Sequence, residues 1–292
     1  MMCYNKIKKR GFVLKIITPT QIEKFYAHLM EEEKSSTTIS KYLHDVMAFE
    51  NWLSAQELNK RAVLSYKAHL LERYSVSSVN SMLSSLNAFF TYVEWFDLKV
   101  KMIKVQRQIF ASSEKELTKT EYERLLKAAK GKKNERLYLL MQTICACGIR
   151  VSELKHVTIE AVRTEQAEIN CKGKRRKVFL PHELCKMLKK YAGEKKIKSG
   201  PIFITKNGNP LDRSNIWSDM KRLCEIAGVS EKKVFPHNLR HLFARTYYGL
   251  QKDIVRLADI LGHSNVNTTR IYTQENGEIH RKQIQKLGLL RC

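Results

Sequence analysis

Apolar residues recur at helical spacing through the first hundred positions, with short polar breaks between the runs. Residues 18–33 carry apolar side chains at three- and four-residue intervals, which predicts an amphipathic helix with Thr18 as its N-cap and Pro19 in its first turn. The same spacing predicts three more helices, over residues 35–53, 59–74 and 75–96. Four helices joined by short connections predict a compact helical bundle.

Two of these helices begin in stretches rich in Ser, Thr and Asn, at residues 35–38 and 75–80. Free backbone N–H groups and hydroxyls at a helix start can contact phosphate groups. Ordinary N-capping explains the same residues equally well, so both interpretations stay open.

The helical periodicity is lost over residues 99–117, which are basic and lack an apolar face. We therefore expect a linker at residues 106–117, after a first domain at residues 1–105. Thr118 and Glu121 have the spacing of a capping box, which predicts a helix at the start of a second domain, residues 118–292.

The second domain is mostly helical in pattern, with one interruption. Residues 166–181 alternate in polarity and carry β-branched residues around a Lys-Gly-Lys turn, which predicts a β-hairpin. A short strand is expected at residues 201–205. The sequence thus predicts a mainly α protein of two domains with a small β-hairpin or sheet.

Charge narrows the range of partners. Lys and Arg number 53 against 29 Asp and Glu, a formal net charge of +24. Residues 1–110 contribute +6 of this charge and residues 111–292 contribute +18. Such an excess indicates a polyanionic partner, although a basic surface kept for solubility is the alternative.

Other features exclude classes of protein. No apolar run approaches the roughly 18 residues of a membrane-spanning helix, and the first residues lack the apolar core of a signal peptide. The seven cysteines are scattered, and the only close pair, Cys145 and Cys147, is a poor zinc signature. These features indicate a cytoplasmic protein with reduced thiols, no metal site and no membrane association.

Four stretches of the second domain could carry chemistry: CGIRVSEL around Arg150, the hairpin turn CKGKRRK, FPHNLRHLFART with His237 and Arg240, and LGHSNVNTTRIYTQ with His263 and Tyr272. Helical spacing places His237 and Arg240 together on a face away from the buried leucines. Taken singly, each stretch has an ordinary explanation: a helix cap, solvated lysines, a surface pair and a core tyrosine.

Together, in this order and spacing, the four stretches resemble the tyrosine recombinase (phage integrase) family. The resemblance runs across the whole second domain, and the helical first domain resembles the core-binding domain of that family. It implies a site-specific DNA recombinase of the integrase or resolvase type, which cleaves and rejoins DNA strands through a 3′-phosphotyrosine intermediate without a cofactor.

The resemblance also implies roles for individual residues. Tyr272 matches the nucleophile, and Arg150 and Arg240 match the two arginines that stabilise charge on the phosphate, for which forked guanidinium donors suit better than lysine. Lys172 matches the proton donor to the leaving oxygen. His237 matches a general base or hydrogen-bond partner.

Further assignments concern the surroundings of these groups. His263 would hold the phosphate through a hydrogen bond, and Glu153 matches the acidic residue that supports the site. The family places its lysine directly before the turn glycine, which selects Lys172 over Lys174. Lys174, Arg175 and Arg176 are then expected to contact DNA. His241 points about 100° away from Arg240 and is expected to have no direct chemical role.

The final residues, 275–292, are amphipathic, with Ile279, Ile284 and Leu287 apolar. They could pack on their own domain, but the family docks such a tail on a neighbouring protomer, and we expect a homotetramer on two double-stranded DNA sites.

The first helix begins near residue 18, which leaves no room for the arm-binding domain of larger integrases. A simple, Xer-like recombinase is expected, whose role in integration, excision, inversion or resolution, for example in a mobile element, stays open.

Two other functions would also involve DNA. A DNA-binding protein of the same fold without the chemistry would lack one catalytic group, and none is missing. A type IB topoisomerase has a related site but acts as a monomer with little sequence preference, and the motif sequences and the tail argue against it.

Overall fold

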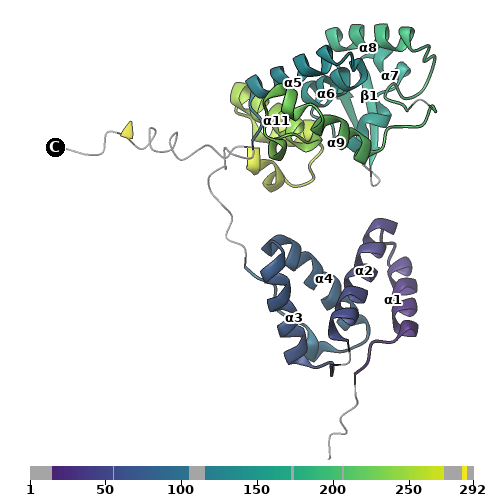
Figure 1. Ribbon diagram of the computed structural model, residues 1–292, viewed down its shortest axis with the longest axis vertical. Coiled ribbons are helices and arrows are strands. Elements are labelled where there is room, and N and C mark those ends of the chain that lie inside the picture. The colour runs from purple at the N-terminus through teal and green to yellow at the C-terminus, as the bar shows by residue number, and fades with distance from the viewer. Residues whose placement is uncertain are drawn as a thin grey trace, which may run out of the picture. The chain divides into compact units, whose positions relative to one another are not determined.

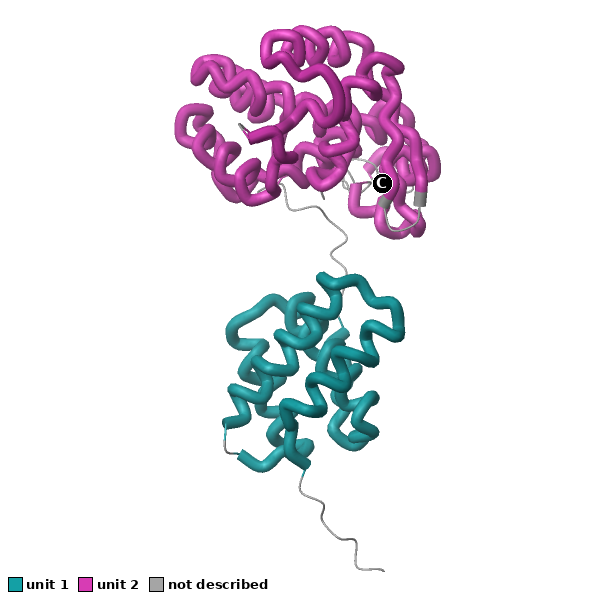
Figure 2. Tube along the Cα trace, turned by 90° about the vertical axis from the view of Figure 1, so that its right-hand side faces the viewer, with its two compact units in different colours: residues 1–107 teal, residues 108–292 magenta. Residues whose placement is uncertain are grey.

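The computed structural model describes residues 15–54, 56–104, 116–171, 174–205, 207–272 and 285–287. The chain forms two compact units, residues 1–107 and residues 108–292, shown in different colours in Figure 2. Described helices dominate both units, and the described strands form one two-stranded sheet. The predicted fold class, mainly α with a small hairpin, is confirmed.

The first unit contains the four predicted helices: α1 (Pro19–Glu31), α2 (Ser36–Leu53), α3 (Lys60–Arg73) and α4 (Val76–Tyr92), followed by a short 3-10 turn, η1 (Phe96–Leu98). Thr18 and Gln21 form a capping box at the start of α1. Ser35 and Ser75 cap α2 and α4 by accepting hydrogen bonds from the backbone N–H groups of Thr38 and Ser78. Each helix therefore begins where its sequence offers a side-chain acceptor for free N–H groups.

Apolar stripes of these helices meet in one core, centred on α4, which packs on α2 and α3. Phe49, Phe89 and Phe90 are fully buried there, and Phe49 meets Phe90 edge-on with ring centroids 6.0 Å apart. This core gives the bundle its own stability, separate from that of the second unit.

Residues 99–103 belong to the bundle, although their sequence shows no helical period. The side-chain amide of Asn87 pairs with both backbone groups of Val100, at 2.8 and 2.9 Å, and Asn80 pairs in the same way with Ile103, at 2.8 Å for both bonds. Val100 is buried against the core. The linker predicted at residues 106–117 falls mostly on residues 105–115, which lie outside the described residues.

The second unit is built around α6 (Glu135–Cys147), which contacts α5, α8, α9 and α11 (Figure 1). The helices around it are α5 (Lys119–Gly131), α7 (Ile159–Thr164), α8 (His182–Glu194), α9 (Arg213–Lys221), α10 (Cys224–Ala227), α11 (Pro236–Gln251) and α12 (Ile254–Leu261). The described residues of this unit also form 3-10 turns, namely η3 (Val151–His156), η4 (Glu231–Lys233) and η5 (Val266–Tyr272). Thr118 and Glu121 form the predicted capping box of α5.

The predicted hairpin consists of β1 (Gln166–Cys171) and β2 (Lys174–Phe179), paired antiparallel from Gln166–Phe179 to Cys171–Lys174. Ala167, Ile169 and Val178 face the core, because alternate residues of a strand share a face. Arg176 pairs with Ile169 in this register and therefore lies on the inward face.

The strand predicted at residues 201–205 is wrong as a strand. Within the described part of this segment the chain makes isolated β-bridges, Thr158 with Pro201 and Ile204 with Pro210, around the buried Ile202 and Phe203. Its apolar side chains enter the core, but among the described residues no strand lies beside it with which it could form a longer ladder.

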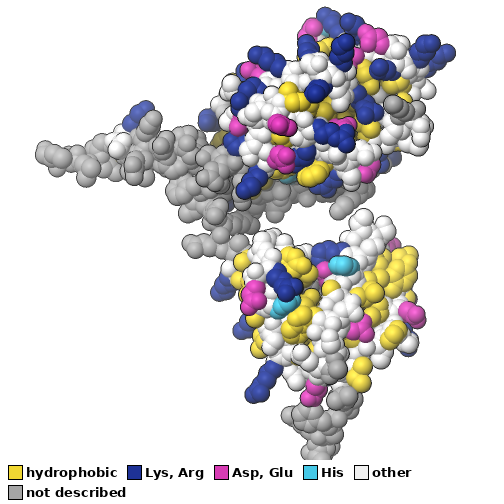
Figure 3. All heavy atoms as spheres, viewed as in Figure 1, with side chains coloured by type: hydrophobic (Ala, Val, Ile, Leu, Met, Phe, Trp, Pro, Cys, Tyr) yellow, Lys and Arg dark blue, Asp and Glu magenta, His cyan; other side chains and the backbone are white. Residues whose placement is uncertain are grey.

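Basic side chains are spread over the visible face of the second unit, with fewer acidic ones between them (Figure 3). In the part of the chain that the structure describes, no helix has the length and apolar character needed to cross a membrane.

Candidate active site

Three of the four sequence stretches meet at the junction of α6, α11 and η5. Gly148 ends α6 in the left-handed conformation, at φ +62°, and a Cβ atom there would collide with the ring of Phe243 on α11. Only glycine combines this dihedral angle with so close an approach. The tight junction sends the chain directly into Arg150 and η3 beside α11.

Glu153 fixes the position of Arg150. Its carboxylate accepts hydrogen bonds from the backbone N–H and from Nη1 of Arg150, each 2.8 Å long. Glu153 is 2% exposed, and burial acts to raise its pKa. The backbone bond from Arg150 and the charges of Arg176 and Arg150 outweigh burial, so its pKa is lowered and the carboxylate stays ionised. The Arg150 guanidinium is left partly exposed in a fixed direction.

Arg240 is buried, which corrects the prediction that it lies off the core with His237. It is 1% exposed, and its guanidinium donates to the carbonyls of Gly148 at 2.5 Å and Leu261 at 2.7 Å. Burial and the nearby charge of Arg150 lower the pKa of Arg240 to about 10, so it remains a cation at neutral pH. Among the described residues its Nε has no hydrogen-bond partner.

His263 lies against Arg240 in one tautomer. Nη2 of Arg240 is 3.1 Å from Nε2 of His263, and Nδ1 of His263 is 2.9 Å from Oγ1 of Thr269. A guanidinium can only donate, so Nε2 accepts and the ring proton lies on Nδ1. Burial and the charges of Arg240, Arg150 and Arg176 lower the pKa of His263 to about 4, which keeps the ring neutral.

Two more histidines near these groups, His237 and His241, belong to α11. His237 is exposed, yet partial burial and the charges of Arg240, Arg150 and Arg213 lower its pKa. The ring of His241 lies between His237, at 4.4 Å between centroids, and Tyr272, at 4.9 Å. Burial and neighbouring cations lower the pKa of His241 to about 3, and its buried Nε2 has no partner among the described residues. His241 therefore packs directly on the tyrosine.

Tyr272 ends η5 inside the cluster. It is 4% exposed and packs with Ala244, Leu257 and Leu261. Its ring is nearly parallel to that of His263, with 6.3 Å between centroids. Burial raises the pKa of Tyr272, while the charge and hydrogen bonding of Arg240 and the charge of Arg150 act against the rise. The phenol is neutral at pH 7 and couples to both arginines.

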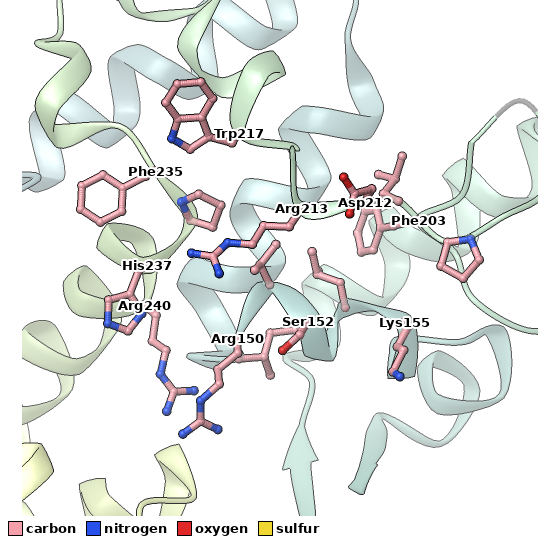
Figure 4. Close-up of a pocket in the computed structure, with 16 residues that line it drawn as sticks. Arg150, Ser152, Lys155, Phe203, Asp212, Arg213, Trp217, Phe235, His237 and Arg240 are labelled. Carbon is pink, nitrogen blue, oxygen red and sulfur yellow. The ribbon is translucent and has the colours of Figure 1, made fainter. Parts of the chain in front are cut away.

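A cavity of about 490 Å³ opens beside these groups. Figure 4 shows the Arg150 and Arg240 guanidiniums side by side at one end of it, with His237 next to Arg240. Arg213, at the start of α9, extends toward His237 from the opposite wall (Figure 4). No ion pair among the described residues engages Arg213, which is exposed. The sequence does not single out Arg213, because nothing in the local pattern shows that α9 faces the cavity.

The predicted hairpin residues differ in placement. Lys172 lies outside the described residues, and of Lys174 the backbone alone is described. Arg175 is exposed, as a DNA contact requires. Arg176 turns inward, and its Nη2 donates to Glu153 at 2.6 Å. The strand alternation of β2, with Val178 and Leu180 inward, is the signal that could have shown this.

The described residues contain no group of three or more His, Cys, Asp or Glu side chains that could hold a metal ion. Cys145, Cys147, Cys185 and Cys224 are free thiols. Burial raises the pKa of Cys145 to about 11 and that of Cys147 to about 12, which keeps both protonated.

Comparison with known families gives two matches along the chain. The model of the phage integrase family matches residues 115–278, and that of the phage integrase N-terminal SAM-like domain matches residues 22–95. The two matches fall in the second and first units respectively.

Relatives match over nearly the whole length. Tyrosine recombinase XerA of Thermococcus kodakarensis is 32% identical over 92% of this chain and 95% of its own. Tyrosine recombinase XerD of Proteus mirabilis is 29% identical over 86% of this chain and 87% of its own.

Among solved structures, a crystal structure of XerA recombinase is 25% identical, with a TM-score of 0.51 over 93% of this chain and 99% of that one. A lambda integrase dimer bound to a COC′ core site shares the fold, with a TM-score of 0.72 at 16% identity over 90% of this chain and 97% of that chain.

Proposed function

Since this chain belongs to the phage integrase family of tyrosine recombinases, we propose that it cleaves and rejoins DNA at a specific site through a 3′-phosphotyrosine intermediate. The observation that carries the proposal is the position of Tyr272. It lies against His263 and His241, and it couples electrostatically to Arg240 and Arg150 of the same chain. Tyr272 would therefore attack DNA bound by its own protomer.

In the proposed step, Oη of Tyr272 attacks the scissile phosphorus, and the bond from phosphorus to the 5′-oxygen breaks. The tyrosine proton leaves, and the 5′-oxygen takes up a proton to become a hydroxyl. One phosphodiester replaces another, so a 5′-hydroxyl can reverse the step on the same or another strand without an added energy source. Recombination requires this reversal on a new partner strand.

Arg150 and Arg240 are proposed to stabilise charge on the non-bridging phosphate oxygens. Both guanidiniums are fixed before DNA arrives, Arg150 by Glu153 and Arg240 by two backbone carbonyls. Preorganised donors spend no energy on reorientation during the reaction, and each one removed from such a site costs about 3–4 kcal/mol of barrier.

The histidines are proposed to handle protons and to align the phosphate. Tyr272 has a raised pKa, so its proton needs an acceptor, and His237 is neutral and opens to the cavity. His263 is proposed to hold the phosphate through Nε2–H, which requires that, when DNA binds, Nε2 exchange its contact with Arg240 for one with the phosphate and the ring proton move from Nδ1 to Nε2. Lys172 is proposed as the proton donor to the 5′-oxygen, on the family resemblance of the hairpin turn alone.

We also propose contacts outside the site. Lys174 and Arg175 are proposed to bind the DNA backbone. The amphipathic residues 275–292 are proposed to dock on a neighbouring protomer within a tetramer on two DNA sites. A lambda integrase tetramer bound to a Holliday junction is among the structures that share this fold. The protein is proposed to act in the cytoplasm.

The test uses nicked duplexes made from DNA that flanks the gene in its own genome. Cleavage beside a nick releases a short strand, so the covalent intermediate accumulates and is seen as an SDS-resistant adduct. We expect an adduct with the parent chain and none with Tyr272→Phe, whose DNA affinity should stay within about threefold, because removing one hydroxyl hardly changes the phosphate contacts.

Tyr247→Phe is the matched control. Tyr247 packs against the same cluster, and its substitution should leave the adduct intact. An adduct that survives Tyr272→Phe would contradict the assignment of the nucleophile. Tight binding without an adduct on any mapped binding site would favour a DNA-binding protein without strand cleavage.

A further inference from the structure

Arg176 joins three segments of the site through one side chain. It lies on the inward face of β2 with its side chain 14% exposed. Nη2 donates to Glu153 at 2.6 Å, and Nη1 donates to the carbonyl of Ile260. Both arms of the fork therefore bond groups within the protein, whereas the family resemblance predicts a DNA contact for this residue.

The first arm of the fork, Nη2, acts on Arg150 indirectly, through Glu153. Oε2 of Glu153 takes a bond from Arg176 and a second from the backbone N–H of Arg150, and Oε1 binds the Arg150 guanidinium. The carboxylate thus lies between two arginines. Without Arg176, one oxygen of a buried carboxylate would lose its cation, and Glu153 would be free to rotate away from Arg150.

The second arm reaches the turn before His263. The carbonyl of Ile260 lies in the last turn of α12, and Gly262 follows in the left-handed conformation at φ +66°. A Cβ on Gly262 would come within 2.6 Å of Cδ and 2.8 Å of Nε of Arg176. The stem of Arg176 therefore packs directly against the residue that precedes His263.

Arg240 also joins the turn that carries Arg150 to the end of α12. It bonds the carbonyls of Gly148 and Leu261, close in the chain to the Arg150 turn and to Ile260. Two arginine forks thus connect the Arg150 turn with the end of α12. Arg240 comes from α11, whereas Arg176 comes from the hairpin that carries Lys172.

We propose that Arg176 is a positioning residue that holds Arg150 and the His263 turn in register and fastens the hairpin to both. The proposal rests on the proposed function, because it assigns Arg176 to the same phosphate site. It requires both arms of a planar fork, so lysine cannot replace it.

The test compares Arg176→Ala and Arg176→Lys with Lys177→Ala, a neighbouring β2 residue that is exposed on the outward face. Adduct formation is timed on saturating nicked duplex with an ordinary phosphate, and on the same duplex with a methylphosphonate at the scissile position. The methylphosphonate lacks one charged oxygen, so it depends less on a correctly aligned Arg150.

We expect Arg176→Ala to cleave the ordinary phosphate about 30- to 100-fold more slowly, the loss typical of a misplaced catalytic group. On the methylphosphonate the loss should shrink to about threefold, because less charge needs stabilisation. Arg176→Lys should stay at least about tenfold slow on the phosphate, since one ammonium cannot bridge both acceptors. Lys177→Ala should match the parent chain on both substrates.

Four outcomes would overturn the proposal. Weaker DNA binding with a normal rate at saturation would make Arg176 the DNA contact first expected. An equal loss on both substrates would indicate general disruption, and full activity of Arg176→Lys would mean that charge alone suffices. If the parent chain forms an adduct and Arg176→Ala equals it, this inference fails while the proposed function stands. If the parent chain forms none, the proposed function itself fails.

Discussion

Arg150 and Arg240 carry the same guanidinium in opposite environments, and this difference separates two effects of substitution. Arg240 is 1% exposed and bonds two backbone carbonyls, whereas the side chain of Arg150 is 37% exposed and, among the described residues, bonds only Glu153. Arg240→Ala should lower the free energy of unfolding of the second unit by about 2–4 kcal/mol, because buried acceptors lose their donor. Arg150→Ala should lower it by about 1 kcal/mol or less. Both should slow adduct formation by about 100-fold or more.

Urea unfolding of the second unit can be followed through Trp217, which is the only tryptophan in residues 108–292. Trp52 and Trp95 are replaced by phenylalanine in every chain compared, so that fluorescence reports this unit alone. Equal stability losses for the two alanine variants would contradict the structural role assigned to Arg240.

His241 predicts how stability depends on pH. Its pKa in the folded protein is lowered to about 3, so the unfolded chain takes up a proton first as the pH falls below about 6.5. The stabilisation by the neutral ring is complete above about pH 6.5 and is lost progressively toward pH 3. Each pH unit within this window should remove about 1 kcal/mol through His241.

His241→Gln should therefore flatten the fall in unfolding free energy of the second unit between pH 6.5 and pH 5. The measurement is the Trp217 urea transition at several pH values. His44→Gln, an exposed position on α2 of the first unit, is the control and should leave the slope unchanged. The same steep slope in His241→Gln would show that other groups cause it.

At the scale of elements, the junction of α6 with η3 depends on Gly148. An added Cβ would be strained at φ +62° and would collide with Phe243, which would displace α11 and the Gly148 carbonyl that Arg240 binds. Gly148→Ala should cost about 2–4 kcal/mol of unfolding free energy. Adduct formation should fall with it, because the second arginine moves.

Gly131→Ala is the matched control for this prediction. Gly131 is the last residue of α5, and a Cβ there meets no atom within 4 Å. The change should be neutral or stabilise the unit by up to about 1 kcal/mol, since alanine favours the helix. The measurement is the unfolding midpoint of each variant relative to the parent chain. A Gly148→Ala variant as stable as the parent chain would contradict the packing described at the junction.

The elements that sequence could predict are those set by local rules. Thr18 and Thr118 cap helices because the acceptor and the N–H groups it satisfies lie within four residues. Residues 99–103 and 201–205 could not be assigned in this way. The first segment is held by the side chains of Asn80 and Asn87 on α4, and the second is joined by a bridge to the distant Thr158. Such partners cannot be identified from local pattern.

In the candidate site too, local motifs could be identified from the sequence, whereas contacts between distant segments could not. Motifs brought Arg150, His237, Arg240, His263 and Tyr272 forward, and the structure places all five around one junction. The burial of Arg240 could not be predicted, because it depends on carbonyls contributed by Gly148 and Leu261. Arg213 was missed for a similar reason, since its side chain meets the cavity only after α9 packs on α6.

At the scale of the whole molecule, the charge of +24 predicts that DNA binding weakens as the salt concentration rises. Binding to a duplex releases condensed cations, and the logarithm of the affinity falls with the logarithm of salt concentration by about 0.9 for each phosphate neutralised. A chain that binds DNA phosphates through many basic side chains should lose DNA affinity steeply between low and physiological salt concentration. A flat response would contradict a phosphate-dominated interface.

Arg213 allows the salt dependence of DNA binding to be tested at a single basic side chain. If the Arg213 guanidinium in the cavity wall, which no ion pair among the described residues engages, binds a phosphate near the scissile one, Arg213→Ala should lower the salt slope by about one unit. Arg222→Ala removes the same charge from the far end of α9, where Arg222 is exposed beside Asp219, and should leave the slope unchanged. Equal changes in both variants would mean that net charge alone draws the chain to DNA, and that the cavity wall makes no contact of its own.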